Sequence, residues 1–147
     1  MAGFACGADR SARDAAPTNL VGEVDIRRTA PATPERAILL WAQAVQFGDL
    51  AAVESAYTRR VREAVSPARL RAAAAVVSAA LGRPEIVFVS LGQQRARVRV
   101  ALVSYDADGR RSVQPTTFLL RREGGRWQLD DADLLLDTAA ALRRARR

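Results

Sequence analysis

The sequence predicts an α+β fold in which three N-terminal helices pack on a curved antiparallel sheet of about four strands, with a further helix at the C-terminal end. Two observations lead to this prediction. Apolar residues recur at helical spacing through residues 33–81, and they alternate with polar residues from residue 85 to residue 131. Short glycine-containing segments separate the alternating stretches, which is typical of tight turns between antiparallel strands.

The composition restricts the chemistry that this chain of 147 residues can perform. Its 23 basic residues, all of them arginine, outnumber 16 acidic residues and give a net charge of +7. A basic balance favours anionic partners, but a solvated basic surface is the simpler explanation. The chain has no histidine and one cysteine, Cys6, which excludes histidine-ligated metal sites and an intrachain disulfide. We therefore predict no metal and no cofactor.

Residues 1–18 are small, polar and charged without periodicity, so we expect a disordered tail or tether before a domain that spans residues 19–132. Cys6 and the tether after it resemble the mature N-terminus of a bacterial lipoprotein. That resemblance implies a lipid on Cys6 and a tethered position outside a membrane. No basic and apolar signal segment precedes Cys6, so this interpretation requires a start upstream. Otherwise Cys6 is an incidental thiol and the location stays open.

Residues 19–28 alternate in polarity and are predicted as a short edge strand. The central helix follows over residues 33–49. Thr33 is a good N-cap, Pro34 suits the first helical position, and Gly48 ends the helix. One wide apolar face is expected to pack on the sheet, and it comprises Ala37, Leu40, Trp41, Ala44, Val45 and Phe47.

Two further helices are predicted before the sheet. Residues 50–57 form a short one, and a helical or turn segment rich in arginine follows it. Ser66 and Pro67 open the third helix, whose alanine-rich body covers residues 68–81. Its many small side chains indicate close packing against another backbone.

Four strands are predicted over residues 85–91, 95–105, 112–122 and 126–131. The first is apolar on both faces, and the second alternates most regularly. Pro115 marks an edge position or a bulge in the third, because proline cannot donate a ladder hydrogen bond. Residues 133–147 then form a basic C-terminal helix.

The order of these elements resembles the nuclear transport factor 2-like superfamily. The resemblance covers about residues 33–132 and depends on the paired helices around Gly48 and Asp49, the meander, and a closing strand with Gly125 and Trp127. It implies a cone-shaped domain with a pocket between the long helix and the sheet. That pocket serves isomerases, cyclases and epoxide hydrolases in some members, and binds ligands or partners in others. The ligand-binding residues would then be Trp41, Tyr57, Phe88, Val98, Val100 and Phe118.

No catalytic set of that superfamily is visible in the sequence. An isomerase-like enzyme would use Tyr57 with Asp131, or with the adjacent Asp130, inside an apolar cavity. The structural alternative is a buried ring for Tyr57 and an N-cap role for one of the aspartates. We therefore expect a non-enzymatic domain that binds a small apolar ligand or a protein partner, and we keep the isomerase or cyclase as the alternative.

Arg95, Arg97 and Arg99 form a row on one side of the second strand. Such a row can bind phosphates, and it can equally be a solvated sheet face paired with acids such as Glu85. Nucleic acid is the less favoured partner because no aromatic platform accompanies the row. The superfamily resemblance adds a homodimer through the sheet as a candidate assembly, and the basic C-terminal end adds an anionic membrane surface.

Overall fold

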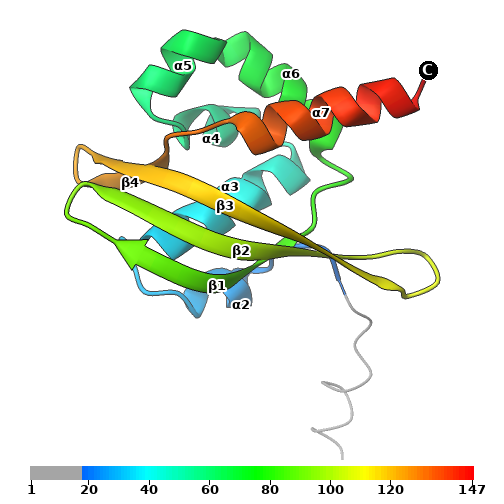
Figure 1. The fold of residues 1–147 in the computed structure, drawn as a ribbon, viewed down its shortest axis with the longest axis horizontal. Helices are drawn as coiled ribbons and strands as arrows, with labels where there is room; N and C mark the ends of the chain where they lie inside the picture. Colours follow the sequence, from blue (N-terminus) through cyan, green and yellow to red (C-terminus); the bar gives the residue numbers. More distant parts are fainter. Residues whose placement is uncertain (1–17) are drawn as a thin grey trace, which may run out of the picture.

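The computed structural model describes residues 18–147, and it confirms the predicted α+β class. Helices come first, a sheet follows, and one helix closes the described chain (Figure 1). The elements, in order, are α2 (Glu23–Arg27), α3 (Pro34–Phe47), α4 (Leu50–Ser55), α5 (Arg59–Val65), α6 (Pro67–Val77), β1 (Arg83–Leu91), β2 (Arg95–Tyr105), β3 (Arg111–Glu123), β4 (Arg126–Leu129) and α7 (Asp133–Ala145). Cys6 lies outside the described residues.

The sheet is an antiparallel meander with the strand order β1-β2-β3-β4. Strand β2 pairs over its whole length with residues 111–121 of β3, whereas β4 pairs only with residues 120–123 of β3. The remainder of β3 is therefore an edge on its β4 side. Pro115 lies in this part of β3, opposite Ala101 of β2. The backbone nitrogen of Pro115, which carries no hydrogen, thus faces the side without a neighbouring strand. This agrees with the edge position predicted for Pro115.

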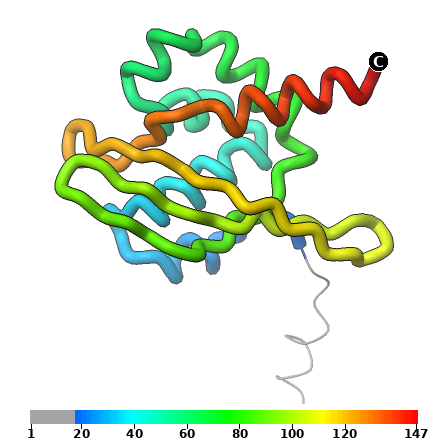
Figure 2. The backbone as a smooth tube through the Cα atoms, in the orientation of Figure 1, coloured from blue at the N-terminus to red at the C-terminus, as the bar shows by residue number. Residues whose placement is uncertain are grey.

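Helix α3 runs beside the sheet, and the core lies between the two (Figures 1 and 2). The inner face of β2 contributes Val98 and Val100, both almost fully buried. The Trp41 ring packs edge-on against Phe118 of β3, with ring centroids 5.4 Å apart. Side chains therefore fill the space between α3 and the inner face of the sheet, where the superfamily resemblance placed a pocket.

A bulge in β1 changes the predicted pattern of that strand. Ile86 pairs with Val100 and Val89 pairs with Val98, and both residues of β1 pack against the core. The register shifts between Ile86 and Phe88, so two residues of β1 oppose one residue of β2. Val87 and Phe88 are consequently exposed, at 63% and 55%. The strand is apolar on both faces, as predicted, but Phe88 lies on the outer face.

The ends of α3 are capped as predicted. The Thr33 hydroxyl accepts a hydrogen bond from the Arg36 amide at 3.3 Å, and Pro34 occupies the first turn. Gly48 has a φ of 73°, a left-handed conformation that glycine adopts without steric cost. The Asp49 carboxylate then caps α4 by accepting from the Ala52 amide.

The edge strand predicted for residues 19–28 is wrong, because this segment contains helix α2. Local capping outweighs the alternating pattern there: the Gly22 amide donates to the Asp25 carboxylate at 2.8 Å and holds the first turn of the helix. The segment before α2 is fixed to the domain by Asn19. The carboxamide of Asn19 accepts from the Tyr105 amide and donates to the Tyr105 carbonyl, as a neighbouring strand would.

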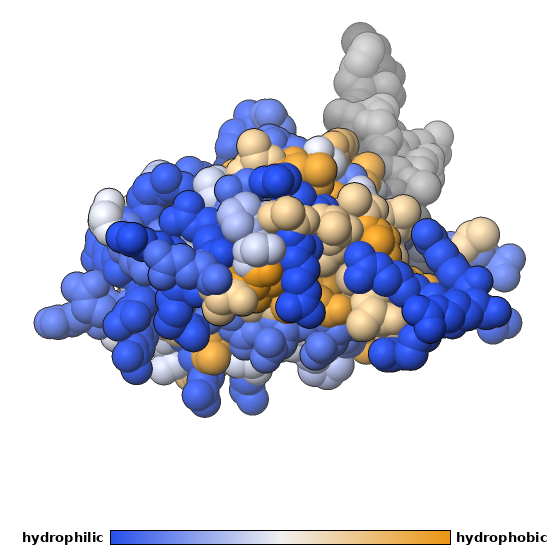
Figure 3. All heavy atoms as spheres, turned by 90° about the horizontal axis from the view of Figure 1, so that it is seen from above, coloured by the Kyte–Doolittle hydropathy of each residue, from blue (hydrophilic) through white to orange (hydrophobic). Residues whose placement is uncertain are grey.

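Helix α7 packs on α6 and buries Leu135 and Ala139. Small residues of α6, Ala73 and Ala74, are buried, as the alanine-rich sequence of that helix predicts. Figure 3 views this side from above and shows hydrophobic residues gathered between strongly hydrophilic ones. None of the helices in residues 18–147 is long and apolar enough to cross a membrane.

Candidate functional site

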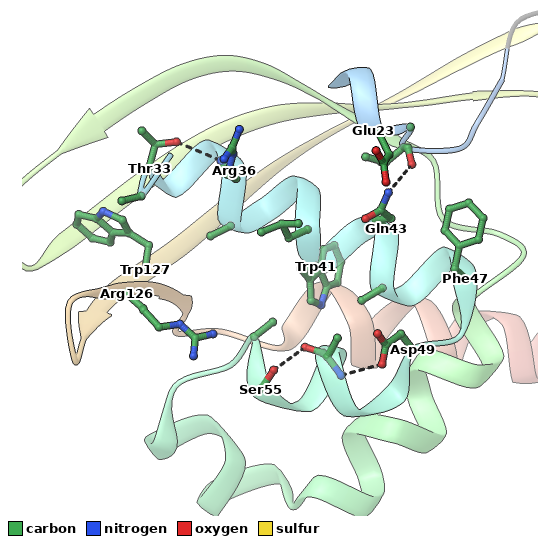
Figure 4. Close-up of a pocket in the computed structure, with 18 of the residues that line it drawn as sticks. Glu23, Thr33, Arg36, Trp41, Gln43, Phe47, Asp49, Ser55, Arg126 and Trp127 are labelled. Atoms are coloured by element: carbon green, nitrogen blue, oxygen red, sulfur yellow. Dashed lines mark hydrogen bonds between the residues drawn. The ribbon is translucent and has the colours of Figure 1, made fainter. Parts of the chain in front are cut away.

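A groove of about 830 Å³ runs along α3 on the side that the sheet does not cover (Figure 4). Helix α4, the segment that leads into α2, and the β3–β4 turn border it. Volumes of this size are typical of small-molecule sites. The lining comprises Val21, Gly22, Glu23, Ala32, Thr33, Arg36, Ala37, Leu40, Trp41, Gln43, Ala44, Phe47, Asp49, Ala52, Ser55, Ala56, Gly125, Arg126 and Trp127.

The floor of the groove is a second apolar face of α3. Ile38, Ala42 and Val45 face the core, and none of them lines the groove. Leu40 and Phe47 belong to the groove instead, and they are 47% and 62% exposed. From the sequence, both residues were expected on the face that packs against the sheet. The structure corrects this prediction, because the helix is apolar on two sides and the sheet covers only one.

The two ends of the groove differ in character (Figure 4). Phe47 stands at one end, and the β3–β4 turn brings Trp127 and Arg126 to the other. The Arg122 guanidinium lies 5.8 Å from the centroid of the Trp127 ring and fixes that ring by a cation–π contact. Arg126 is exposed, and within residues 18–147 its side chain makes no ion pair or hydrogen bond.

Most polar side chains of the groove are already hydrogen-bonded to neighbouring groups of the protein, mainly backbone. Arg36 donates to the carbonyls of Ile26 and Thr29 and to the Thr29 hydroxyl, which ties the loop after α2 to α3. Gln43 donates to the Val21 carbonyl at 3.3 Å, and Ser55 donates to the Ala52 carbonyl at 3.1 Å. Thr33 and Asp49 serve as the helix caps described above. The groove therefore presents mainly apolar surface to a ligand.

Tyr57 lies outside the groove lining, although Trp41, its hydrogen-bond partner, forms part of the floor. The phenol is 1% exposed, and its oxygen accepts a hydrogen bond from the Trp41 indole N–H at 2.9 Å. Desolvation by burial raises the pKa of Tyr57 well above its ordinary value, and the negative charge of Asp131 adds to the shift. The structural role considered for Tyr57, a buried ring, is thus the one that the geometry shows.

Asp130 and Asp131, which follow β4, accept hydrogen bonds from neighbouring side chains and from a backbone amide. Asp130 accepts from the Thr58 hydroxyl at 2.8 Å and from the Arg60 guanidinium at 3.2 Å. Asp131 accepts from the Asp133 amide at the start of α7, and its charge raises the pKa of the Asp133 carboxyl. Neither Asp130 nor Asp131 lines the groove. The Tyr57/Asp131 pair that an isomerase would need is therefore not assembled there.

The remaining predicted ligand-binding residues do not converge on one cavity. Trp41 contributes to the groove floor. Val98, Val100 and Phe118 are buried in the core under α3, and none of them lines the groove. Phe88 is on the outer face of the sheet, because the β1 bulge directs it away from the core. Among residues 18–147, no group of three or more acidic or cysteine side chains is placed to hold a metal ion.

Apart from Trp41, the groove residues on α3 and at the β3–β4 turn were not predicted as ligand-binding from the sequence. The available signal was the unbroken apolar run from Ile38 to Trp41, which is wider than one buried stripe needs. The contribution of Arg126 and Trp127 depends on where the turn lies in space, and no local pattern specifies that.

The fold resembles those of solved bacterial proteins, although no protein-family model and no curated protein matches the sequence. A SEC-C motif containing protein from Rhodopseudomonas palustris superposes with a TM-score of 0.56 at 16% identity, over 76% of this chain and 85% of that one. A protein of unknown function from Mycobacterium tuberculosis superposes with a TM-score of 0.53 at 13% identity, over 85% of this chain and 95% of that one. At such identities the likeness establishes the fold alone.

Proposed function

We propose that the chain is a non-enzymatic binding domain of the nuclear transport factor 2-like type, whose groove along α3 takes a small apolar molecule. The observation that carries the proposal is that the groove is large but offers few unbonded polar side chains to a ligand. A space of about 830 Å³ is lined by Ala37, Leu40, Trp41 and Ala44, while most polar side chains around it are used by nearby backbone. Apolar contact is then the main source of binding free energy.

The ionisable side chains of the groove also support a non-enzymatic function. Catalysis by proton transfer needs an ionisable group within hydrogen-bond reach of the reacting atom, with a pKa near the working pH. Glu23 and Arg126, the ionisable side chains of the lining without a bonded partner among residues 18–147, lie on opposite borders of the groove. The isomerase or cyclase alternative would require Tyr57 and Asp130 or Asp131 in the lining, and none of the three is there.

Intrinsic fluorescence tests the proposal, because Trp41 and Trp127, the two tryptophans of the chain, both line the groove. We expect the neutral apolar probe N-phenyl-1-naphthylamine to quench their emission saturably and with a stoichiometry of one. Leu40→Glu places a charge on the groove floor and should weaken binding at least tenfold. Leu119→Glu, at a similarly exposed position on the outer sheet face, is the matched control and should bind as the wild type does.

Circular dichroism and thermal melting of both variants verify that each is folded. Equal loss of binding in the two variants, or unsaturable quenching, would contradict the assignment of the ligand to the groove.

A protein partner is the second candidate, and the exposure of Leu40 and Phe47 favours it. These side chains lie on one line along α3, where an apolar helix face of a partner would pack between α2 and α4. A Leu-rich amphipathic model peptide that slows hydrogen exchange at the α3 and α4 amides, while the naphthalene probe fails to bind, would support this candidate over the first.

A further inference from the structure

The outer face of the sheet concentrates positive charge at one end. Arg95, Arg97 and Arg99 project outwards from β2, and Arg121 of β3 lies directly opposite Arg95. We call these four residues the arginine face. Like charges at directly paired positions of a sheet destabilise it. Within residues 18–147, none of the four side chains forms an ion pair.

At the other end of the same face, two arginines share one carboxylate, so their charge is partly compensated. Glu85 accepts from Arg83 at 3.3 Å and lies 3.7 Å from Arg111. Glu85 was the acid expected to pair with the arginine row, but its carboxylate contacts Arg83 and Arg111 instead. The arginine face therefore retains an uncompensated charge that has a cost to the fold, and an anionic partner would offset that cost.

Exposed apolar side chains alternate with these charges. Leu119 lies opposite Arg97 in the β2–β3 register and is 39% exposed. Phe88 lies opposite Arg99 in the β1–β2 register, and the β1 bulge adds Val87 beside it. Alternate residues of a strand are separated by roughly 6.8 Å, so each guanidinium has an apolar group within side-chain reach. Interleaving of arginine with aliphatic and aromatic groups suits the headgroup region of a bilayer, which takes both.

Two other occupants fit this face less well. Single-stranded nucleic acid requires exposed aromatic platforms for its bases. One face of the Phe88 ring, the aromatic group beside the row, carries the Arg99 guanidinium at 5.6 Å from its centroid, which leaves one ring face for stacking. A second copy of the chain would present the same patch across a two-fold axis. It would then bring two uncompensated arginine faces to one interface.

We propose that the outer face of the sheet binds the surface of a bilayer rich in anionic phospholipid. The arginine face pairs with lipid phosphates, and Leu119, Phe88 and Val87 enter the headgroup layer between them. The groove along α3 is on the other side of the sheet and stays accessible while the protein is bound, so this function is separate from the one proposed for the groove.

Vesicle co-sedimentation tests the proposal. We expect the protein to sediment with vesicles of phosphatidylglycerol and phosphatidylcholine, to remain in solution with phosphatidylcholine alone, and to be released by salt. Each basic residue near an anionic surface changes partitioning about fivefold, so R95Q/R97Q/R99Q should reduce it on the order of a hundredfold. The control R27Q/R28Q/R69Q removes the same charge from exposed positions outside the strands, in or next to helices α2 and α6, and should change partitioning less than tenfold.

A separate variant tests the contribution of the exposed apolar side chains to bilayer binding. Leu119→Ser keeps every charge and should lower partitioning severalfold at low salt. Thermal melting checks that each variant is folded, and the salt and lipid dependence of the wild type tests the proposal even if one variant is not.

Three results would overturn the proposal. Equal losses in the two triple variants would show a general charge effect. Tighter binding of an oligothymidylate strand than of anionic vesicles, at the same salt and unaffected by Leu119→Ser, would assign the face to nucleic acid. A stable dimer in sedimentation equilibrium that R97E dissociates would assign it to a second copy.

Discussion

The indole N–H of Trp41 donates a hydrogen bond of 2.9 Å to the phenolic oxygen of Tyr57, and both side chains are about 1% exposed. The bond joins α3 to the segment between α4 and α5. That segment in turn extends the sheet, because the Thr58 amide donates to the Leu129 carbonyl and the Leu129 amide donates to the Ala56 carbonyl. The Trp41–Tyr57 pair therefore connects α3, which forms the groove floor, to β4 at the edge of the sheet, next to the turn that borders the groove.

Tyr57→Phe tests the contribution of this bond. The ring volume is kept, but the buried indole N–H loses its acceptor, so we expect a loss of about 1–3 kcal/mol in the free energy of unfolding. Urea denaturation measures it. Adding Trp41→Phe removes the orphaned donor, and the double variant should be less destabilised than the sum of the two single variants. Strict additivity would show that the bond contributes nothing.

Trp41→Ala should cost roughly 3–5 kcal/mol, because it removes a buried ring from both the core and the groove floor. Trp127→Ala provides the control, since that ring is only partly buried and borders the groove. We expect it to cost clearly less in the same urea experiment. An unchanged melting midpoint in Trp41→Ala would refute the buried position of this ring.

High pH should destabilise the protein through Tyr57. Burial raises the pKa of this phenol in the folded state, whereas the unfolded chain ionises near its ordinary value of about 10. Above that pH the unfolded state releases a proton that the folded state retains, so stability is complete below about pH 10 and falls as pH rises. The expected slope from this group is about 1.4 kcal/mol per pH unit.

The chain has no lysine, whose side chain ordinarily titrates in the same pH range as tyrosine. Few other groups therefore contribute to the slope between about pH 9 and pH 12. Urea denaturation at several alkaline pH values, on the wild type and on Tyr57→Phe, isolates the slope. Absorbance at 295 nm should show no phenolate from Tyr57 before unfolding. Equal slopes in the two proteins would contradict the buried, neutral phenol.

The sequence was sufficient for the elements whose signals are local. The caps Thr33, Gly48 and Ser66 fixed helix ends, and the alternation from Arg95 to Tyr105 predicted β2 to the residue. Residues 19–28 were misassigned because one side-chain bond, from the Gly22 amide to Asp25, decided between strand and helix. A pattern of alternating polarity cannot reveal a bond of that kind.

The site was less predictable than the fold, because it depends on which side of α3 the sheet covers. Leu40 and Val45 are equally apolar in sequence, yet Leu40 is 47% exposed and Val45 is fully buried. The bulge at Val87 likewise turned Phe88 to the outer face, and nothing in the residues around it marks an extra position. Both outcomes follow from tertiary packing and strand register, which a local pattern does not contain.

Gly82 makes a close approach that no other described glycine repeats. A Cβ atom at this position would lie 2.8 Å from the carbonyl oxygen of Val103, where β1 begins to pair with β2. Gly82→Ala should therefore force the two backbones apart and cost about 1–3 kcal/mol, as overpacking does. Thermal or urea denaturation measures the loss, and hydrogen exchange should locate it at the first residues of β1.

Gly48→Ala separates this effect from an ordinary glycine effect. Gly48 has a positive φ of 73° but nothing within 4 Å of the added methyl group, so its replacement carries only the conformational cost of the left-handed region. That cost is about 1 kcal/mol and should leave exchange in β1 unchanged. We expect Gly82→Ala to be the more destabilising of the two. If the order were reversed, the junction between α6 and β1 would be able to move by the few tenths of an ångström that the methyl group requires.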